Sequence, residues 1–203
     1  MTKLLYGLLR APLRFLFTVK SFLHQIFPQM NPPSYTWSTC FLTLFAACTA
    51  RYRKGEVDFQ GYYTAADLAF LTSIGYKPRE FFDFVEDHVN YGDPTPEASL
   101  LVAAVRRDYL KVIQHSQLST RETTPDQLPP KPQAIDGISW LPRLIVKARL
   151  KLRGEMDPEI MYGCGGDRQF FAKHDIHPAD FLRTVWAAGD DDAKIVAYVK
   201  KQG

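Results

Sequence analysis

The chain has 203 residues, of which 46% are hydrophobic and 23% are charged, as in an ordinary globular protein that buries a core without disulfides or metals. Its formal net charge of +3 is too small to indicate a nucleic-acid-binding surface. The three cysteines, Cys40, Cys48 and Cys164, include no CxxC pair, which argues against a disulfide framework and against a zinc site. We therefore expect a cytoplasmic protein with no metal, no cofactor and no nucleic-acid partner.

Residues 1–29 form an apolar segment that contains basic side chains but no acidic ones. Arg10 and Arg14 lie four residues apart, so both would project from one face of a helix, as in amphipathic helices that lie on a membrane surface. The same charges make the segment a poor transmembrane span. Residues 3–27 therefore predict a peripheral membrane anchor. The alternative is that the protein starts at Met30 and that the preceding residues are upstream sequence.

Most of the remaining chain repeats itself at an offset of about 100 residues, as in proteins built by duplication of one module. Glycine, proline, acidic and aromatic residues recur in the same order in both parts. The matched pairs are Gly55 and Gly154, Glu56 and Glu155, Asp58 and Asp157, Tyr63 and Tyr162, Asp67 and Asp167, Phe70 and Phe170, Pro78 and Pro178, Phe81 and Phe181, and Val85 and Val185. So many ordered matches predict two copies of one module.

Apolar residues at helical spacing, bounded by glycine and proline, predict four short helices in each copy. The first helix of each copy should end at Gly55 or Gly154, and the third should begin with Pro78 or Pro178, where a missing N–H costs nothing. The expected starts or capping residues are Ser38, Thr64, Pro78 and Thr95 in the first copy and Trp140, Asp167, Pro178 and Asp190 in the second.

No segment shows the alternating pattern that predicts a strand. Residues 116–136 are rich in proline, serine and threonine and are typical of a semi-extended linker. The predicted fold class is therefore all-α: two tandem copies of a short four-helix module, over residues 30–115 and 137–203, joined by a proline-rich linker.

Three strings in the second copy carry a family resemblance: Trp140-Leu141-Pro142-Arg143, Leu152-Arg153-Gly154 and Asp167-Arg168-x-Phe170. They resemble the bacterial domain of unknown function 5069, over about residues 134–202. The first copy departs from that pattern, with Phe41-Leu42-Thr43-Leu44 in place of Trp-Leu-Pro-Arg. The resemblance implies a shared fold for the second copy, and it implies no reaction and no catalytic residue.

The segment Tyr162-Gly163-Cys164-Gly165-Gly166-Asp167, here called the glycine turn, is the most site-like stretch. The backbone N–H groups of Gly165 and Gly166, at the start of a helix, could bind an anion, and the same field would favour the thiolate form of Cys164. The simpler interpretation is a tight turn with a small packed thiol. Asp167 also opposes an anion site, because its carboxylate would compete for those N–H groups.

Arg143 and Lys147 lie four residues apart on the helix that precedes the glycine turn. They would share one helix face and could hold a phosphate or a carboxylate. The alternative is an ordinary solvated basic face.

Several acidic and histidine residues are weaker candidates. The carboxylate pairs of the two copies could do acid–base work, but a pair that recurs in a duplicated scaffold more simply marks shared turn geometry. Three adjacent aspartates suit a helix N-terminus better than a metal ion, and no histidine falls in a recognised catalytic motif. These residues are Glu56 with Asp58, Glu155 with Asp157, Asp190 to Asp192, and His24, His88, His115, His174 and His177.

The sequence is best interpreted as a non-catalytic helical binding or scaffold protein, because a duplicated module is evident and a strong catalytic motif is not. One alternative is a thiol-dependent enzyme or redox protein that uses Cys164. Another is a peripheral membrane protein anchored by residues 3–27. The partner, whether a protein or a membrane surface, is left open by the sequence.

Overall fold

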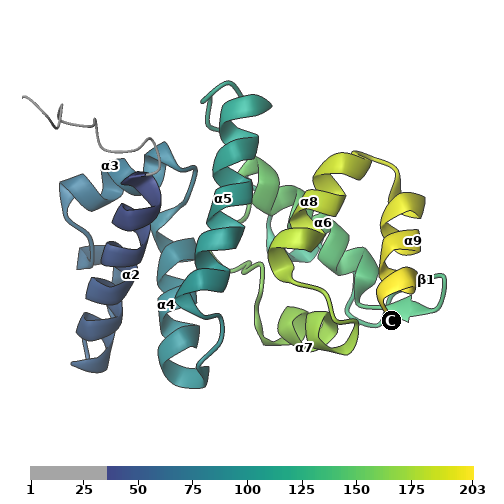
Figure 1. Ribbon diagram of the computed structural model, residues 1–203, viewed down its shortest axis with the longest axis horizontal. Helices are drawn as coiled ribbons and strands as arrows, with labels where there is room; N and C mark the ends of the chain where they lie inside the picture. Colours follow the sequence, from purple (N-terminus) through teal and green to yellow (C-terminus); the bar gives the residue numbers. More distant parts are fainter. Residues whose placement is uncertain (1–35) are drawn as a thin grey trace, which may run out of the picture. The chain divides into compact units, whose positions relative to one another are not determined.

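The computed structural model describes residues 36–203, and Figure 1 shows the helices in chain order. The first half comprises α2 (Thr36–Arg53), the 3-10 turn η1 (Phe59–Gly61), α3 (Ala65–Ser73), α4 (Pro78–Tyr91) and α5 (Pro96–Val112). The second half comprises α6 (Leu141–Arg153), α7 (Gly165–Lys173), α8 (Pro178–Ala188) and α9 (Asp192–Gln202). Between them lie η2 (Pro125–Gln127), β1 (Ala134–Ile135) and β2 (Ile138–Ser139). The prediction of a mainly helical protein is confirmed.

The predicted membrane anchor, residues 3–27, lies outside the described residues, as does Met30. A helix that crosses a bilayer needs about 20 predominantly apolar residues. Within residues 36–203, none of the helices combines that length with sufficient apolar character.

The expectation of no strand is wrong for a small hairpin that precedes α6. Ala134 pairs with Ser139 and Ile135 with Ile138, in antiparallel register. Strands of two residues are too short for an alternating pattern to be visible in the sequence. The connecting residues are Asp and Gly with positive φ, the pair that favours a two-residue hairpin turn.

The proline-rich linker contacts the second half through its backbone. Thr123 forms an isolated parallel bridge with Met156. The Thr123 N–H donates to the Glu155 carbonyl oxygen at 2.8 Å, and the Asp157 N–H donates to the Thr123 carbonyl oxygen at 3.3 Å.

The helix starts follow local chemistry, with one correction. Thr64 caps α3 in a reciprocal capping box with Asp67, as predicted. Asp167 was expected to cap α7, but α7 begins two residues earlier and its capping position is Cys164, whose side chain makes no capping hydrogen bond. The Asp167 carboxylate instead reaches back from the first turn and accepts the Gly163 N–H at 2.9 Å.

Aromatic rings pack around Phe81 in the first half and around Phe181 in the second, and both phenylalanines are fully buried. In the first half, the Phe81 ring meets those of Phe41 and Phe45 edge-on, with centroids 5.1 and 5.8 Å apart. In the second half, Phe181 meets Phe171 at 5.6 Å. Such edge-to-face pairs add about 0.5–1.5 kcal/mol beyond the burial of their area.

Helix α5, the last helix of the first half, packs against α6 and α8 of the second half. Its buried Arg106 donates from Nε to the Gly75 carbonyl oxygen at 3.0 Å and from Nη1 to the Leu152 carbonyl oxygen at 2.9 Å. A β-carbon on Gly75 or Gly154 would come within 2.8 or 2.5 Å of this guanidinium. Two glycines, one in each half, therefore leave the space that the arginine fills.

A second buried cation also connects the halves. Lys151 on α6 is 1% exposed, and its Nζ lies 3.3 Å from Glu80 Oε1 on α4 and 3.6 Å from the centre of the Tyr76 ring. Burial lowers the pKa of the Lys151 ammonium, and the Glu80 carboxylate opposes that shift. Consistent with these contacts, residues 38–203 form one compact unit.

Candidate functional site at the junction of the two halves

The structure brings together two residues of the predicted glycine-turn site. Lys147 Nζ lies 3.3 Å from Cys164 Sγ. The same ammonium forms an ion pair with Asp167, and both members of that pair are almost completely buried. The positive charge that would favour a thiolate is therefore already matched by a carboxylate.

Asp167 is fully satisfied by the chain itself. One carboxylate oxygen accepts from Trp140 Nε1 at 2.9 Å, and the other accepts the Gly163 N–H and meets Lys147. A buried carboxylate needs such partners to stay ionised at low cost. Asp167 therefore takes up the Lys147 ammonium, one of the groups predicted to hold an external anion.

The other residues predicted to bind an anion, Arg143, Gly165 and Gly166, have different neighbours. Arg143 donates from Nη1 to the Pro129 carbonyl oxygen at 2.8 Å. Gly165 is exposed as the first residue of α7. Gly166 lies against the Trp140 indole, where an added β-carbon would come within 2.4 Å of the ring. Of the predicted set, Cys164 and Lys147 meet, while Arg143 has a separate partner.

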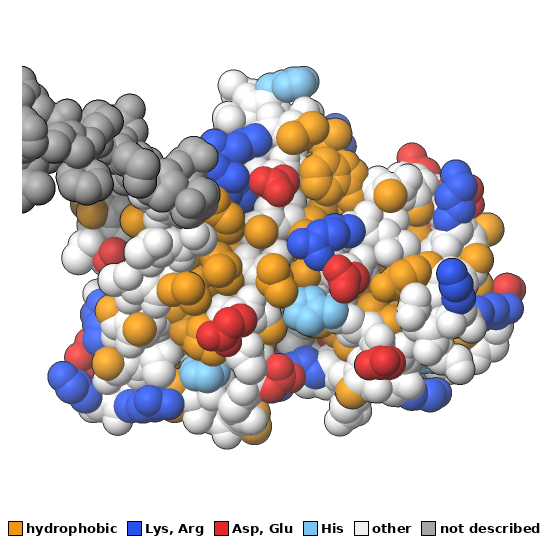
Figure 2. Space-filling model, viewed as in Figure 1, with side chains coloured by type: hydrophobic (Ala, Val, Ile, Leu, Met, Phe, Trp, Pro, Cys, Tyr) orange, Lys and Arg blue, Asp and Glu red, His pale blue; other side chains and the backbone are white. Residues whose placement is uncertain are grey.

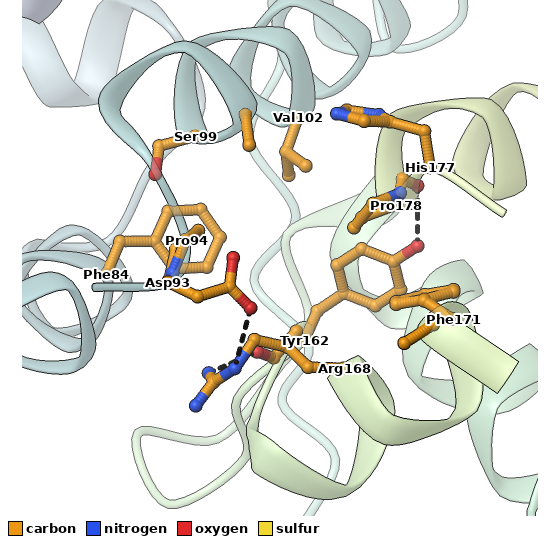
Figure 3. A pocket seen from close by; sticks show the side chains of 13 residues that line it. Phe84, Asp93, Pro94, Ser99, Val102, Tyr162, Arg168, Phe171, His177 and Pro178 are labelled. Carbon is orange, nitrogen blue, oxygen red and sulfur yellow. Dashed lines mark hydrogen bonds and ion pairs between the residues drawn. The ribbon is translucent and has the colours of Figure 1, made fainter. Parts of the chain in front are cut away.

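A cavity of about 200 Å³ opens beside the glycine turn, between the two halves. Figure 3 shows side chains of the first half, including Phe84 and Ser99, facing side chains of the second half, including Tyr162 and Phe171. Most of the lining is apolar or aromatic. Clefts with apolar walls and a few placed polar groups are typical ligand sites, so this cavity, here called the junction cavity, is the candidate functional site.

The aromatic wall of the cavity is held in place by a backbone contact. Tyr162 is 1% exposed, and its hydroxyl donates to the Pro178 carbonyl oxygen at 2.8 Å. Its ring packs on Phe171 with centroids 5.9 Å apart. Burial raises the pKa of the Tyr162 hydroxyl well above its usual value, so this group stays protonated and acts as a donor.

One polar group of the cavity has no partner. Ser99 on α5 is fully buried, and its Oγ makes no hydrogen bond within residues 36–203. A buried hydroxyl without a partner costs about 1–3 kcal/mol.

Charged groups lie at one side of the cavity. Arg168 on α7 meets two carboxylates of the first half, Asp87 and Asp93, and its Nε lies 3.1 Å from Asp93 Oδ2. Its Nη1 also donates to the Gly163 carbonyl oxygen at 2.8 Å. His177, at the start of α8, accepts the Ala179 N–H on Nδ1 at 3.1 Å.

Sequence reasoning identified one part of this site and missed the rest. Tyr162 and Gly163, two residues of the glycine turn, line the cavity, whereas Cys164, Gly165 and Gly166 do not. Ser99 carries no signal in the sequence, because a serine in the first turn of a helix is ordinary. Its significance comes only from the burial that the second half imposes.

The remaining acidic candidates have structural partners. Glu56 pairs with Arg51 at 2.8 Å, and Glu155 pairs with Arg153 at 2.7 Å. Asp191 caps α9. Within the described part of the chain, no group of three or more histidine, cysteine or acidic residues could hold a metal ion, and Figure 2 shows acidic and basic side chains interspersed on one face.

The comparisons with known proteins concern the second half. Residues 129–203 match the model of a family described as a domain of unknown function, DUF5069. This match confirms the resemblance carried by the Trp-Leu-Pro-Arg string. It covers α6 to α9 and includes none of the first half. No curated protein and no solved structure matches the chain. The family description names no activity, so the function must be argued from the geometry.

Proposed function

We propose that this protein is a non-catalytic binding protein, built from two copies of one helical module, and that its ligand site is the junction cavity. The observation that carries the proposal is a largely apolar cavity whose walls come from both halves, with the aromatic rings of Phe84, Tyr162 and Phe171 among its lining residues. A nucleophile held by a base would favour an enzyme instead; Ser99 and His177 both line the cavity, but Ser99 Oγ makes no hydrogen bond to the His177 ring.

Equivalent hydrogen bonds in the two halves support the duplication. The Tyr63 hydroxyl donates to the Pro78 carbonyl oxygen at 3.0 Å, and the Tyr162 hydroxyl donates to the Pro178 carbonyl oxygen at 2.8 Å. These are the pairs matched in the sequence.

The carboxylates that recur in both copies support the same conclusion. Asp58 accepts the N–H two residues ahead at 3.1 Å, and Asp157 does so at 2.8 Å. Both therefore hold a local turn, the structural role expected of residues shared by two copies. In a duplicated scaffold, the surface where the copies meet exists only once, which favours the junction as the place of a specific function.

A ligand-detected NMR screen of small ring compounds tests the proposal. Ala98→Phe places a ring inside the cavity from the first turn of α5, and Leu101→Phe on an exposed position of the same helix is the matched control. Ring compounds should bind the wild-type protein and Leu101→Phe alike and lose binding to Ala98→Phe. If no compound binds, or if binding survives in Ala98→Phe, the junction cavity is not a ligand site.

A second candidate function uses Cys164 as a nucleophile or redox thiol. The specific observation in its favour is the 3.3 Å separation between Cys164 Sγ and Lys147 Nζ. Alkylation by iodoacetamide in a Cys40→Ser, Cys48→Ser background tests it. A rate at neutral pH well above that of a free cysteine would support this candidate, and a rate at or below that of a free cysteine would leave Cys164 as a packing residue.

A further inference from the structure

Two polar side chains that line the junction cavity already have partners within the chain. The Tyr162 hydroxyl donates to the Pro178 carbonyl oxygen at 2.8 Å. The Arg168 guanidinium pairs with Asp93 at 3.1 Å and donates to the Gly163 carbonyl oxygen at 2.8 Å. Figure 3 shows the contacts of Tyr162 with Pro178 and of Arg168 with Asp93. The Tyr162 donor is therefore used, and the charge of Arg168 is balanced, before a ligand binds.

Three other polar side chains of the lining offer a ligand little to bind. Ser99 Oγ is fully buried and has almost no accessible surface. The Asp93 side chain is 57% exposed, so water solvates its carboxylate. His177 uses Nδ1 to accept the Ala179 N–H at 3.1 Å. A polar ligand would therefore give up hydrogen bonds to water and form few new ones, which is unfavourable.

The apolar walls of the cavity favour a different ligand. Phe84 comes from the first half, and Tyr162 and Phe171 come from the second. The Tyr162 and Phe171 rings pack with centroids 5.9 Å apart. Apolar surface gains free energy when it leaves water, and aromatic rings pack well against other rings. This lining therefore selects a ligand by its apolar surface.

The volume of the cavity limits the size of that ligand. The cavity measures about 200 Å³. An apolar protein cavity of about 150 Å³ is large enough to bind benzene. The junction cavity therefore has room for one aromatic ring with a short alkyl substituent.

We infer that the junction cavity binds a small, uncharged, apolar molecule that contains one aromatic ring. The inference rests on the proposed binding function and specifies the polarity and size of its ligand. The ring lies among Phe84, Tyr162 and Phe171, and the ligand makes its contacts through apolar surface.

Four probes with the same ring and one substituent carbon test the polarity: toluene, benzyl alcohol, benzylamine and benzoate. Affinities are measured by NMR titration at neutral pH. Toluene should bind about tenfold or more tightly than benzyl alcohol, a factor that corresponds to about 1.4 kcal/mol, because the alcohol loses its hydrogen bonds to water. Benzylamine and benzoate are both charged at this pH and should bind more weakly than benzyl alcohol, because a charge loses still more hydration.

A series of hydrocarbons tests the apolar contact. Affinity should rise from benzene to toluene to ethylbenzene by about fourfold for each added carbon, which corresponds to about 0.8 kcal/mol per buried methylene group. Affinities that stay flat along this series would overturn the inference, because the added surface would then not be buried.

A single hydroxyl in the wall assigns the preference to the cavity. Ala98 lines the cavity on α5, and Ala104 lies on the same helix outside the lining. Ala98→Ser should weaken toluene about threefold or more and narrow its advantage over benzyl alcohol. Ala104→Ser is the matched control and should alter neither affinity. An advantage of toluene that is unchanged in Ala98→Ser would overturn the inference.

The outcomes separate this inference from the proposal beneath it. If the four probes bind equally, or if a polar or charged probe binds most tightly, and Ala98→Phe abolishes that binding, the apolar ligand class is overturned and the binding function stands. If no probe binds and the ring-compound screen gives no hit, both are overturned.

Discussion

Arg106 offers the sharpest test of how the two halves are joined. Its guanidinium donates to carbonyl oxygens of both halves, on Gly75 and Leu152, and to the side chain of Gln114 at 2.8 Å. Arg106→Ala removes these bonds, leaves buried carbonyl groups without donors and opens a void between two glycines. A hydrogen bond from a charged donor contributes about 1.5–3 kcal/mol to stability. The substitution also removes the desolvation cost of burying the guanidinium, which offsets part of that loss.

We therefore expect Arg106→Ala to lower the free energy of unfolding by about 3–5 kcal/mol, a large share of a typical total of about 5–15 kcal/mol. Urea unfolding followed by circular dichroism measures this loss. Lys111→Ala, an exposed change on the same helix, is the control and should stay within about 0.5 kcal/mol of the wild type. A loss below about 1 kcal/mol for Arg106→Ala would refute the reasoning.

Three further changes test other buried contacts. Gly154→Ala should cost about 2 kcal/mol more than Gly55→Ala in urea unfolding, because both glycines have positive φ but only the β-carbon at 154 would meet Arg106; equal losses would show that the space is not needed. Lys147→Met should cost about 3 kcal/mol, since it leaves a buried carboxylate without its cation, and an unchanged unfolding midpoint would contradict that role. Burial raises the pKa of Asp83 to about 7, so the folded state keeps a proton that the unfolded state releases at lower pH, and stability falls as the pH rises between about 4 and 7. Asp83→Asn should therefore be more stable than the wild type at about pH 8, by up to about 4 kcal/mol, and should gain nothing near pH 4; a gain that is independent of pH would contradict this explanation.

Much of the helical pattern was predictable, because the signals that mark helix ends are local. Pro78 and Pro178 begin α4 and α8, and α6 ends just before Gly154. Thr64 and Asp67 form their box within four residues of chain. The sequence carried one signal for the hairpin before α6, the Asp136-Gly137 pair at its turn. The strands themselves are two residues long, too short to show an alternating pattern.

The candidate site was less predictable, because its residues become significant only through contacts between the halves. The glycine turn was identified from composition. The Asp167 carboxylate within it is bound by Trp140 and Lys147, which are 27 and 20 residues away in the chain. Ser99 and Asp93 gain meaning only when α7 and α8 pack beside them. No single-sequence pattern reports such long-range burial.

The most direct test of the account is a map of amide chemical shifts during titration with toluene, benzyl alcohol, benzylamine and benzoate in turn. If the junction cavity is the ligand site, at least one probe will move the amide signals of Ser99 and Gly163 together, along one saturable curve, and the response will disappear in Ala98→Phe. Shifts that fail to saturate, that are confined to one half, or that persist unchanged in Ala98→Phe would contradict it.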